Sequence, residues 1–531
     1  MTLFSRKRPV SEWIIPGLVA FPALLYAAFL ISVRMSLVDP DILWHILMGR
    51  DICLSGRISM DNPYTWIPGT HWNQHEWLYD IMIYLVSELG TACYLALYSL
   101  LLIGLFLSGL RLNRGRIRAA GLYAVFFVLC FTSFPMNFMN RPSYFSSVLL
   151  PVLFFLEERC LRKDAGRNGR MTVLFFGVGV FLANFHCGQA MVIGAFLLVR
   201  LLSDSIYLLI RRRDAFRALM PGKLIRTAAF LLGLCLNPCG PAQLGNTFLV
   251  AGMQSTGHIA EWEPLELPEY WLAGLTVCYL LTIGYTLGRF LLNEVSAKRF
   301  GVSVPGQDSA VPDGRRMLSD IISLCAAFVL TLKSQKSTVL LVYLLILIWY
   351  PYVEHMIRFI WLAFFGGWRK RPVFPVPGWL IAVAVVLGMI GGVAAQSAGC
   401  RDFTDYVDSQ RAEWMGDEVL EALRGRNYRL LHGYNLSPFL MWEEIPVCMD
   451  TRQQPYASET GDTEILDDVM ELNRTDAEAI DSLLEKYDIE AVMVSEDFDI
   501  RWYLEREDSF RLTAEDERGN SVWVKIQKPQ E

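Results

Sequence analysis

Apolar residues in this chain are gathered into blocks of about 16–23 residues, separated by short polar segments. A helix of about 20 residues crosses the roughly 30 Å hydrocarbon core of a membrane. Hydrophobic residues make up 53% of the sequence and charged residues 19%, where soluble globular domains carry roughly 25% charged residues. The pattern predicts a mainly α, polytopic helical membrane protein and excludes an ordinary soluble protein.

We expect about eleven transmembrane helices from these blocks. The first is long and has no small-residue cleavage site before the following loop, so we interpret it as a span rather than a cleavable signal peptide. The predicted spans are 13–34, 91–110, 117–134, 144–159, 171–186, 190–210, 225–238, 268–290, 317–333, 337–351 and 374–396.

Charge is distributed unevenly along the chain. Basic residues cluster in short loops at 6–8, 111–118, 162–170, 211–217, 315–316 and 369–371. By the positive-inside rule these loops mark the cytoplasmic side, which also places the N-terminus there. Residues 397–531 hold about 32 acidic and 14 basic residues. With eleven crossings this acidic tail lies outside the cytoplasm.

One further apolar stretch, 77–89, contains Asp80 and Glu88 and is short for a span. We interpret it as a helix that lies at the outer interface or enters the membrane part-way, because a twelfth crossing would place the basic 111–118 loop outside. The chain then divides into a transmembrane domain, 1–396, with a large first outer loop at 35–90, and an extracytoplasmic α/β domain, 397–531.

The tail is long enough for one independent core. Its pattern predicts strands at 428–432, 447–449, 491–495 and 522–526 and a helix over 411–423. Thr475 is expected to cap a second helix. Eleven cysteines are scattered through the chain without a CxxC pair, and Cys400 and Cys448 in the tail could pair.

The first outer loop begins with two carboxylates, Asp39 and Asp41, on either side of Pro40. Such a pair can hold a divalent cation such as Mg²⁺ or Mn²⁺ through oxygen ligands, or one carboxylate can serve as a general base. His45 lies one helical turn beyond Asp41. Asp41 as a plain helix N-cap is an equally good interpretation of the same pattern. His71 and His75 have metal-ligand spacing but also fit interfacial residues beside tryptophans.

Cations also lie at predicted outer helix ends. Arg141 offers a guanidinium that can bind phosphate bidentately. Lys333 can bind phosphate as a point charge, although snorkelling at the interface is the favoured interpretation of such a lysine taken alone. Both residues are candidates for holding an anionic substrate.

Other polar residues on the predicted outer side complete the candidate set. Asn184 and His186 stand at the end of a span, where polar residues are usually functional. Glu261 precedes Trp262, which can stack on a sugar or belong to the interfacial aromatic belt. In the tail, Asp450 and Arg452 either pair with each other or face the membrane site.

These residues together resemble a broad family of bacterial polytopic membrane proteins, mostly uncharacterised. The family's first loop runs D-x-D-x-x-x-H, G-R, G, D-x-[YF]-[ST], W and [HE]-E-W-L. The corresponding residues here are Asp39, Asp41, His45, Gly49-Arg50, Gly56, Asp61, Tyr64-Thr65, Trp72 and His75-Glu76-Trp77-Leu78, followed by Arg141-Pro142, Asn184, His186, Asn237-Pro238, Gly240, Glu261-Trp262, Asp450, Arg452 and Tyr456. The spacing departs at Asp61, which stands three residues before Tyr64 rather than two.

That family looks like the GT-C superfamily of membrane glycosyltransferases, which take a sugar from a polyprenyl-phosphate donor at the outer face. The resemblance implies that Asp41 is the principal catalytic or metal-binding carboxylate and that Asp39 assists it. His45, Glu76, His186 and Glu261 would then line the sugar pocket, and the tail would cover it or dock the acceptor.

The sequence therefore predicts an inverting glycosyltransferase-like enzyme of the cell envelope, with a glycan, lipid or protein as acceptor. A non-catalytic transporter, flippase or assembly scaffold is the alternative. A transporter should carry ionisable residues deep in its spans, and we expect these spans to be largely free of them. A nucleic-acid partner is excluded, since the basic clusters are short loops and the only soluble domain is acidic.

Overall fold

The computed structural model of the chain is mainly helical and carries one small β-sheet. It describes residues 14–34, 39–113, 120–132, 141–162, 169–252, 264, 276–277, 279–289, 291, 314–364, 376, 378–459 and 463–526. The chain divides into two compact units. The helical unit comprises Met1–Ser36, Leu95–Leu236 and Glu261–Ala398, and the mixed unit comprises Leu37–Tyr94, Asn237–Ala260 and Gly399–Glu531.

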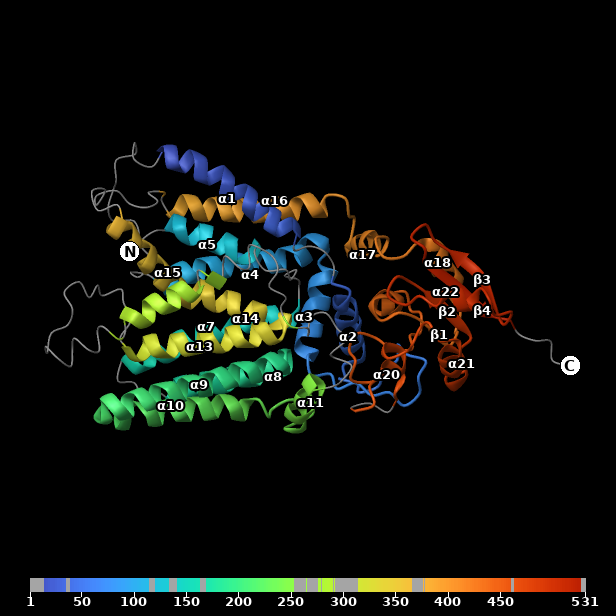
Figure 1. Cartoon of the computed structure of the whole chain (residues 1–531), viewed down its shortest axis with the longest axis horizontal. Helices are drawn as coiled ribbons and strands as arrows, with labels where there is room; N and C mark the ends of the chain where they lie inside the picture. The colour runs from blue at the N-terminus through green and yellow to red at the C-terminus, as the bar shows by residue number, and fades with distance from the viewer. Residues whose placement is uncertain are drawn as a thin grey trace. The chain divides into compact units, whose positions relative to one another are not determined.

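The helical unit is built from apolar helices that run alongside one another (Figure 1). Its described helices are α1 (Ile14–Arg34), α4 (Thr91–Leu112), α5 (Ala120–Thr132), α6 (Pro142–Ser147), α7 (Leu149–Arg162), α8 (Gly169–Phe185), α9 (Cys187–Arg211), α10 (Arg213–Gly233), α13 (Gly314–Lys333), α14 (Thr338–Leu344), α15 (Tyr350–Phe364) and α16 (Gly378–Ser397). Leu345–Trp349 forms a buried π-helical turn that joins α14 to α15.

Among the described residues, four helices are long and apolar enough to cross a membrane: Thr91–Leu112, Cys187–Arg211, Gln335–Ile360 and Gly378–Ser397. Shorter apolar helices cover Leu18–Val33, Ala120–Phe131 and Gly169–Phe185. Most predicted spans thus coincide with helices, and the chain is a multi-pass membrane protein. The number eleven stays a prediction, and the proposed span 268–290 is described only at 276–277 and 279–289, which are helical.

Small residues let the helices of this unit approach closely. A Cβ atom added to Gly388 of α16 would lie 2.3 Å from the carbonyl oxygen of Leu25 in α1. A Cβ atom added to Gly179 of α8 would lie 2.3 Å from the carbonyl oxygen of Phe230 in α10. Backbone contact through small residues is how helices associate where burial of apolar surface gives no driving force.

The mixed unit contains the first outer loop as well as the tail. Its helices include α2 (Asp41–Ser55), α3 (Trp77–Glu88), α11 (Ala242–Gly252), α17 (Phe403–Arg411), α18 (Asp417–Leu423), α19 (Ser437–Trp442), α20 (Ile465–Met470), α21 (Ala477–Lys486) and α22 (Arg501–Leu504). At twelve residues α3 is about 18 Å long, which is too short to cross the hydrocarbon core. The expectation of a short helix at 77–89 is confirmed.

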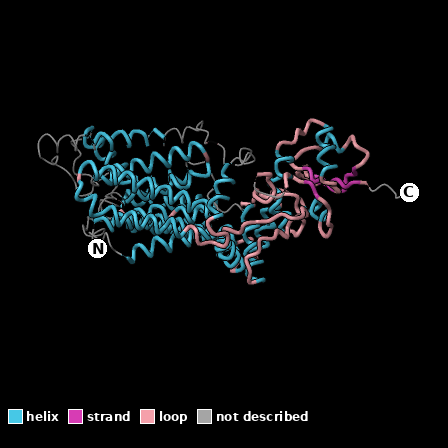
Figure 2. Tube along the Cα trace, turned by 90° about the horizontal axis from the view of Figure 1, so that it is seen from below, coloured by secondary structure: helices cyan, strands magenta, loops and turns pink. Residues whose placement is uncertain are grey.

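A four-stranded sheet of order β1-β2-β4-β3 organises the tail. β1 (Leu430–Leu431) runs parallel to β2 (Ala491–Val494), whereas β4 (Ser521–Lys525) pairs antiparallel with β2 and with β3 (Phe510–Glu515). Figure 2 shows these strands gathered in one place near the C-terminus. All four residues of β2 are buried, as expected for the central strand.

Residues of the first outer loop and of the tail share one core. The amide of Trp66 donates to the carbonyl oxygen of Val447, and the amide of Val447 donates to that of Tyr64. Ile67 is buried in the same apolar cluster as Leu431. The tail begins near the predicted boundary at residue 397, but it folds together with a segment that the sequence assigns to the transmembrane domain.

Several local predictions in the tail are wrong. The helix predicted over 411–423 is interrupted, because α17 ends at Arg411 and α18 begins only after Gly416. The N-cap of α21 is Asp476, whose side chain accepts from the amide of Glu478, and not Thr475. Val447 forms only an isolated bridge with Thr65.

The sequence does not predict strand β3, because four of its six residues are exposed and only Phe510 is buried. The two tail cysteines do not form a disulfide: Cys400 and Cys448 are both free thiols.

Candidate functional site

The two carboxylates of the first outer loop have different environments. Asp39 is buried, and its Oδ1 accepts a hydrogen bond of 3.2 Å from the amide of Asp41. Asp41 is the first residue of α2 and is only partly buried. Asp39 therefore contributes to the start of α2 in the manner expected of a capping side chain, and Asp41 is the more accessible carboxylate of the pair.

His45, one turn further along α2, lies between two carboxylates. Its Nδ1 is 2.6 Å from Oδ1 of Asp80, and its Nε2 is 3.7 Å from Oε2 of Glu76. Glu76 is the N-cap residue of α3 and Asp80 lies in its first turn. The second oxygen of Glu76, Oε1, is 3.6 Å from Nε2 of His75. Carboxylates and imidazoles thus alternate along one buried row.

A glycine makes this arrangement possible. A Cβ atom added to Gly49 of α2 would lie 2.1 Å from the carbonyl oxygen of Asp80. Only glycine lets α2 approach α3 this closely without moving one of the two backbones. Gly49 therefore sets the distance between the helix that carries His45 and the helix that carries Asp80.

Asp450 and Arg452 pair with each other in the mixed unit. The guanidinium of Arg452 donates to Asp450 through Nε at 2.9 Å and through Nη2 at 2.5 Å. Nη2 also donates to Oδ1 of Asn62 at 2.7 Å, and the hydroxyl group of Tyr456 donates to Asp450 at 2.6 Å. The Arg452 guanidinium lies 5.5 Å from the ring centre of Trp72. These contacts fix a loop of the tail to the first outer loop.

Burial governs the electrostatics of these residues. It raises the pKa of Asp80 well above its usual range, and the nearby Glu76 adds to the rise while Arg452 opposes it. Burial would lower the pKa of Arg452, but Asp450 outweighs it, so the guanidinium stays charged. Burial also raises the pKa of Tyr456, which keeps its phenol a hydrogen-bond donor.

The remaining predicted residues belong to the helical unit. Arg141 is the N-cap residue of α6 and is partly buried. The side-chain amide of Asn184 donates to the carbonyl oxygens of Val180 and Leu236, both at 2.7 Å, which gives this residue a structural role at the end of α8.

His186 is the N-cap residue of α9 and is partly buried. Lys333 is exposed at the last position of α13. Glu261 lies outside the described residues. That these side chains meet the first-loop carboxylates in one pocket stays a prediction.

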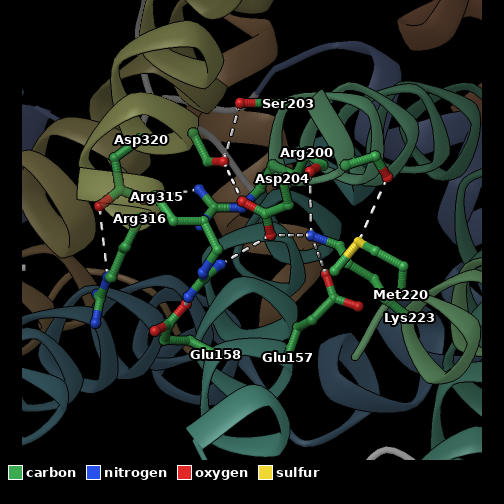
Figure 3. Close-up of polar contacts among 12 residues, drawn as sticks. Glu157, Glu158, Arg200, Ser203, Asp204, Met220, Lys223, Arg315, Arg316 and Asp320 are labelled. Atoms are coloured by element: carbon green, nitrogen blue, oxygen red, sulfur yellow. Dashed lines mark hydrogen bonds and ion pairs between the residues drawn. The ribbon is translucent and has the colours of Figure 1, made fainter. Parts of the chain in front are cut away.

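The helical unit contains a buried network of charged residues that the sequence analysis did not expect (Figure 3). The expectation that the spans are largely free of ionisable residues is wrong for α9, where Arg200 and Asp204 are buried. The other buried charged members come from α7, α10 and α13: Glu157, Glu158, Lys223, Arg226, Arg315, Arg316 and Asp320.

Asp204 is the centre of this network. Its Oδ2 accepts from Lys223 at 2.7 Å and from Arg315 at 2.8 Å, and its Oδ1 accepts from the hydroxyl group of Ser319 at 2.5 Å. Arg200 donates to Asp320 at 2.7 Å. Figure 3 shows the side chains of Asp204, Lys223 and Arg315 pointing toward one another from different helices.

Three functional candidates emerge only in the structure: Asp80, Asn62 and Tyr456. Asp80 carries a sequence signal, since it is an ionisable residue inside an apolar stretch and lies one helical turn after Glu76. Tyr456 belongs to the tail motif Asp450-x-Arg452-x-x-x-Tyr456, but its partner does not follow from that motif. Asn62 carries no signal, because it lies 394 residues from Tyr456 and its side-chain amide donates to the Tyr456 oxygen only through the fold.

Comparison with known proteins gives similarity in structure only. No protein-family model matches the chain, and no curated protein matches its sequence. The crystal structure of the oligosaccharyltransferase of Archaeoglobus fulgidus tethered to an acceptor peptide with an NVT sequon is similar with a TM-score of 0.50 at 12% identity, over 96% of this chain and 74% of that chain.

Two further structures of the same enzyme are similar over 96% of this chain. The apo form has a TM-score of 0.46 at 11% identity over 75% of its chain. The complex with an inhibitory peptide and a dolichol-phosphate has a TM-score of 0.48 at 12% identity over 74% of its chain. At a TM-score of 0.50, the chain shares its fold with the oligosaccharyltransferase of Archaeoglobus fulgidus.

Proposed function

We propose that this protein is a membrane glycosyltransferase that transfers a sugar from a polyprenyl-phosphate-linked donor to an acceptor at the outer face of the membrane. The observation that carries the proposal is the accessible carboxylate Asp41, held at the start of α2 shortly after the first apolar helix, in a chain with the fold of an oligosaccharyltransferase. A carboxylate at this position can activate an acceptor hydroxyl group or hold a cation beside the donor phosphate.

The roles of the other residues follow from their chemistry. Arg141 and Lys333 offer positive charge for the phosphate of the lipid carrier. His45, Glu76, His186 and Glu261 offer hydrogen bonds to a sugar. Asp450 and Arg452 are engaged with each other and with Asn62, so we assign them to holding the tail against the first outer loop rather than to substrate contact.

A divalent cation fits the chemistry of the first loop. Asp39 and Asp41 supply carboxylate oxygens, which Mg²⁺ and Mn²⁺ prefer. Asp39 is buried and accepts from the amide of Asp41, whereas Asp41 is only partly buried, so we assign Asp41 as the principal cation ligand. A cation bound there would stabilise the negative charge that develops on the leaving phosphate.

Asp41→Asn tests the proposal directly. Wild-type protein and the variant are purified in detergent from native membranes, and the bound lipids are extracted and identified by mass spectrometry. We expect a polyprenyl-phosphate sugar to accumulate on the variant, because the donor binds but transfer is blocked. Glu505→Gln, at an exposed position of the mixed unit, is the matched control. Full transfer activity in the Asp41 variant would contradict the assigned mechanism.

A transporter, flippase or assembly scaffold remains the second candidate function. The observation that favours it is the buried charge network of the helical unit, since ionisable residues inside a membrane often mark a transport path. Reconstituted vesicles discriminate between the two functions. Movement of the lipid-linked sugar between leaflets without release of free polyprenyl phosphate would favour transport, and release of polyprenyl phosphate would favour transfer.

A further inference from the structure

Asp80, His45 and Glu76 form a continuous row in the mixed unit. The short contact of 2.6 Å between His45 Nδ1 and Asp80 Oδ1 orients the imidazole, so that its other nitrogen faces Glu76 at 3.7 Å. Hydrogen bonds of acid–base groups are often longer before substrate binds than during reaction. The three groups lie in the order required to pass a proton from one carboxylate to the other through both nitrogens of one ring.

The imidazole is held rigidly in this position. The ring of Trp44 stacks on it with a centroid distance of 3.6 Å, and the ring of Tyr79 meets it edge-on at 4.9 Å. Gly49 fixes the separation of α2 and α3. A ring with this packing keeps the orientation in which each nitrogen faces one carboxylate.

The groups around the row determine its charge. Asp80 is fully buried, His45 is 3% exposed and Glu76 is 7% exposed. His75 faces Glu76 from the other side, and its Nδ1 contacts the carbonyl oxygen of Asn73 at 2.9 Å. Because a carbonyl oxygen only accepts, Nδ1 of His75 carries hydrogen and its Nε2 is the nitrogen that faces Glu76.

Arg452 is the cation that acts on Asp80 from the tail, and its own charge is offset by Asp450. Among the described residues, Asp80 Oδ2 has no hydrogen-bond partner. Burial and the nearby Glu76 raise the pKa of Asp80, so this carboxylate has the proton affinity required of a proton store.

We propose that Glu76 is the general base of the transfer reaction and that His45 and Asp80 are positioning residues that carry its proton into the protein interior. The proposal rests on the proposed glycosyltransferase function and decides between the two roles open to Asp41, which becomes the cation ligand. Glu76 is distinguished from Asp41 by the imidazole of His45, which lies between Glu76 and a second, buried carboxylate, Asp80.

The proton and bond changes balance. The hydroxyl oxygen of the acceptor forms a bond to the anomeric carbon of the sugar, the bond from that carbon to the donor phosphate oxygen breaks, and the polyprenyl phosphate leaves with the electron pair. The hydroxyl proton moves to Glu76. His45 then accepts it at Nε2 and releases the Nδ1 proton to Asp80. Loss of a proton from Asp80 by the reverse path resets the row.

The test measures release of polyprenyl phosphate by mass spectrometry over a pH series. Full-length protein in detergent acts on a solubilised extract of the source cell envelope, which supplies the donor together with lipid, glycan and protein acceptors. We expect Glu76→Gln to lower the rate by at least about 100-fold, the usual contribution of a general base. His71→Gln, at an exposed histidine of the same loop, should retain the wild-type rate and profile.

Asp80→Asn separates proton storage from structure. Removing the second carboxylate makes proton uptake by the row less favourable, so the acidic limb of the wild-type kcat/KM profile should move to lower pH by about one unit while kcat falls. A lower rate with an unchanged pH profile would mean that Asp80 acts only in packing, and would overturn the proposal.

A second measurement tests the relay without requiring enzymatic activity. It can therefore be interpreted even if a variant misfolds or the proposed function is wrong. Protein with ¹⁵N-labelled histidine gives ring signals, and those of His45 are identified by their loss in His45→Gln. In the deprotonated row we expect the hydrogen of the His45 ring to be on Nδ1. We also expect the pH at which the His45 ring signals shift to differ between wild type and Asp80→Asn. A ring with hydrogen on Nε2 at the pH of maximal rate would contradict the relay.

The two experiments have distinguishable failures. If wild-type protein releases no polyprenyl phosphate at any pH, the proposed function fails, and with it the base role of Glu76. If wild-type protein releases polyprenyl phosphate and Glu76→Gln retains the full rate, the function stands and the relay fails.

Discussion

The two units of this protein each bury a polar cluster, and the clusters differ in the partners of their carboxylates. In the helical unit, Asp204 and Asp320 contact arginine and lysine. In the mixed unit, Asp80 and Glu76 contact histidine. Arginine keeps its charge at any accessible pH, whereas histidine gains and loses a proton near neutrality. The same depth of burial therefore yields a fixed ionic connection in one unit and a group that can exchange protons in the other.

The largest expected effect is in the helical unit. Asp204→Asn leaves Lys223 and Arg315 buried without their shared carboxylate, and we expect a loss of about 3–5 kcal/mol in stability. The loss is measured by heating the protein in detergent and following how much of it stays in the monodisperse peak in size-exclusion chromatography. Asp214→Asn in the exposed first turn of α10 is the matched control. A loss below about 1 kcal/mol would show that the network is not a structural connection.

The next effect is in the mixed unit. Arg452→Met removes the partner of buried Asp450 and should destabilise this unit by about 3 kcal/mol. The double variant with Asp450→Asn should recover at least half of the loss, because no uncompensated charge remains. Near-UV circular dichroism during denaturation reports on the surrounding tryptophans. Additive losses in the double variant would refute the pairing.

Overpacking at Gly49 should have a smaller effect. Gly49→Ala places a methyl group against the backbone of Asp80 and should cost about 1–3 kcal/mol. It should also move His45 away from Asp80, which histidine ring signals can detect. Gly104→Ala is the control, since no atom lies within 4 Å of a Cβ added there. Equal stability of the two variants would show that α2 and α3 are not in close contact.

The smallest expected effect is a pH dependence centred on His432. Burial lowers the pKa of this residue, whose Nε2 accepts from the amide of Cys448 and whose Nδ1 contacts the carbonyl oxygen of Gly433. Since the folded state binds a proton less readily than the unfolded state, stability falls as pH drops below about 6.5.

The slope from this one histidine is at most about 1.4 kcal/mol per pH unit. Denaturant unfolding of wild type and His432→Gln measures the difference in the pH dependence of stability. The two buffers, pH 7.5 and pH 5.5, lie roughly one unit on either side of the unperturbed histidine pKa. A wild-type slope that persists unchanged in the variant would assign it to other groups.

The sequence predicts the membrane class well because apolar length is a local property. Most predicted spans coincide with helices, and the short helix at 77–89 is present. Predictions from local sequence patterns are wrong where contacts with residues far along the chain determine the secondary structure. The strand β3 is largely exposed, and Gly416 interrupts a continuous helical pattern with an amide that donates to Asp516, one hundred residues away.

The candidate site shows the same division. The carboxylates Asp39 and Asp41, His45 and Glu76 are close in sequence and can be found by spacing and by resemblance. Their partners cannot be found in this way, since Arg452 reaches Asn62 across 390 positions and Arg315 reaches Asp204 across 111. Neither the burial of Arg200 and Asp204 in α9 nor their pairing was predicted from the sequence, because both depend on which helices pack against α9.

By itself, the sequence determined that this chain enters a membrane, at which positions along the chain basic residues cluster and which polar residues follow the first apolar helix, because hydropathy and charge act over a few turns of helix. Only the tertiary structure decided that the first outer loop folds with the tail, that Asp80 stands behind His45, and that charges from α7, α9, α10 and α13 meet around Asp204. Those outcomes depend on helix packing, in which a glycine or a buried partner far along the chain sets the distance between two helices.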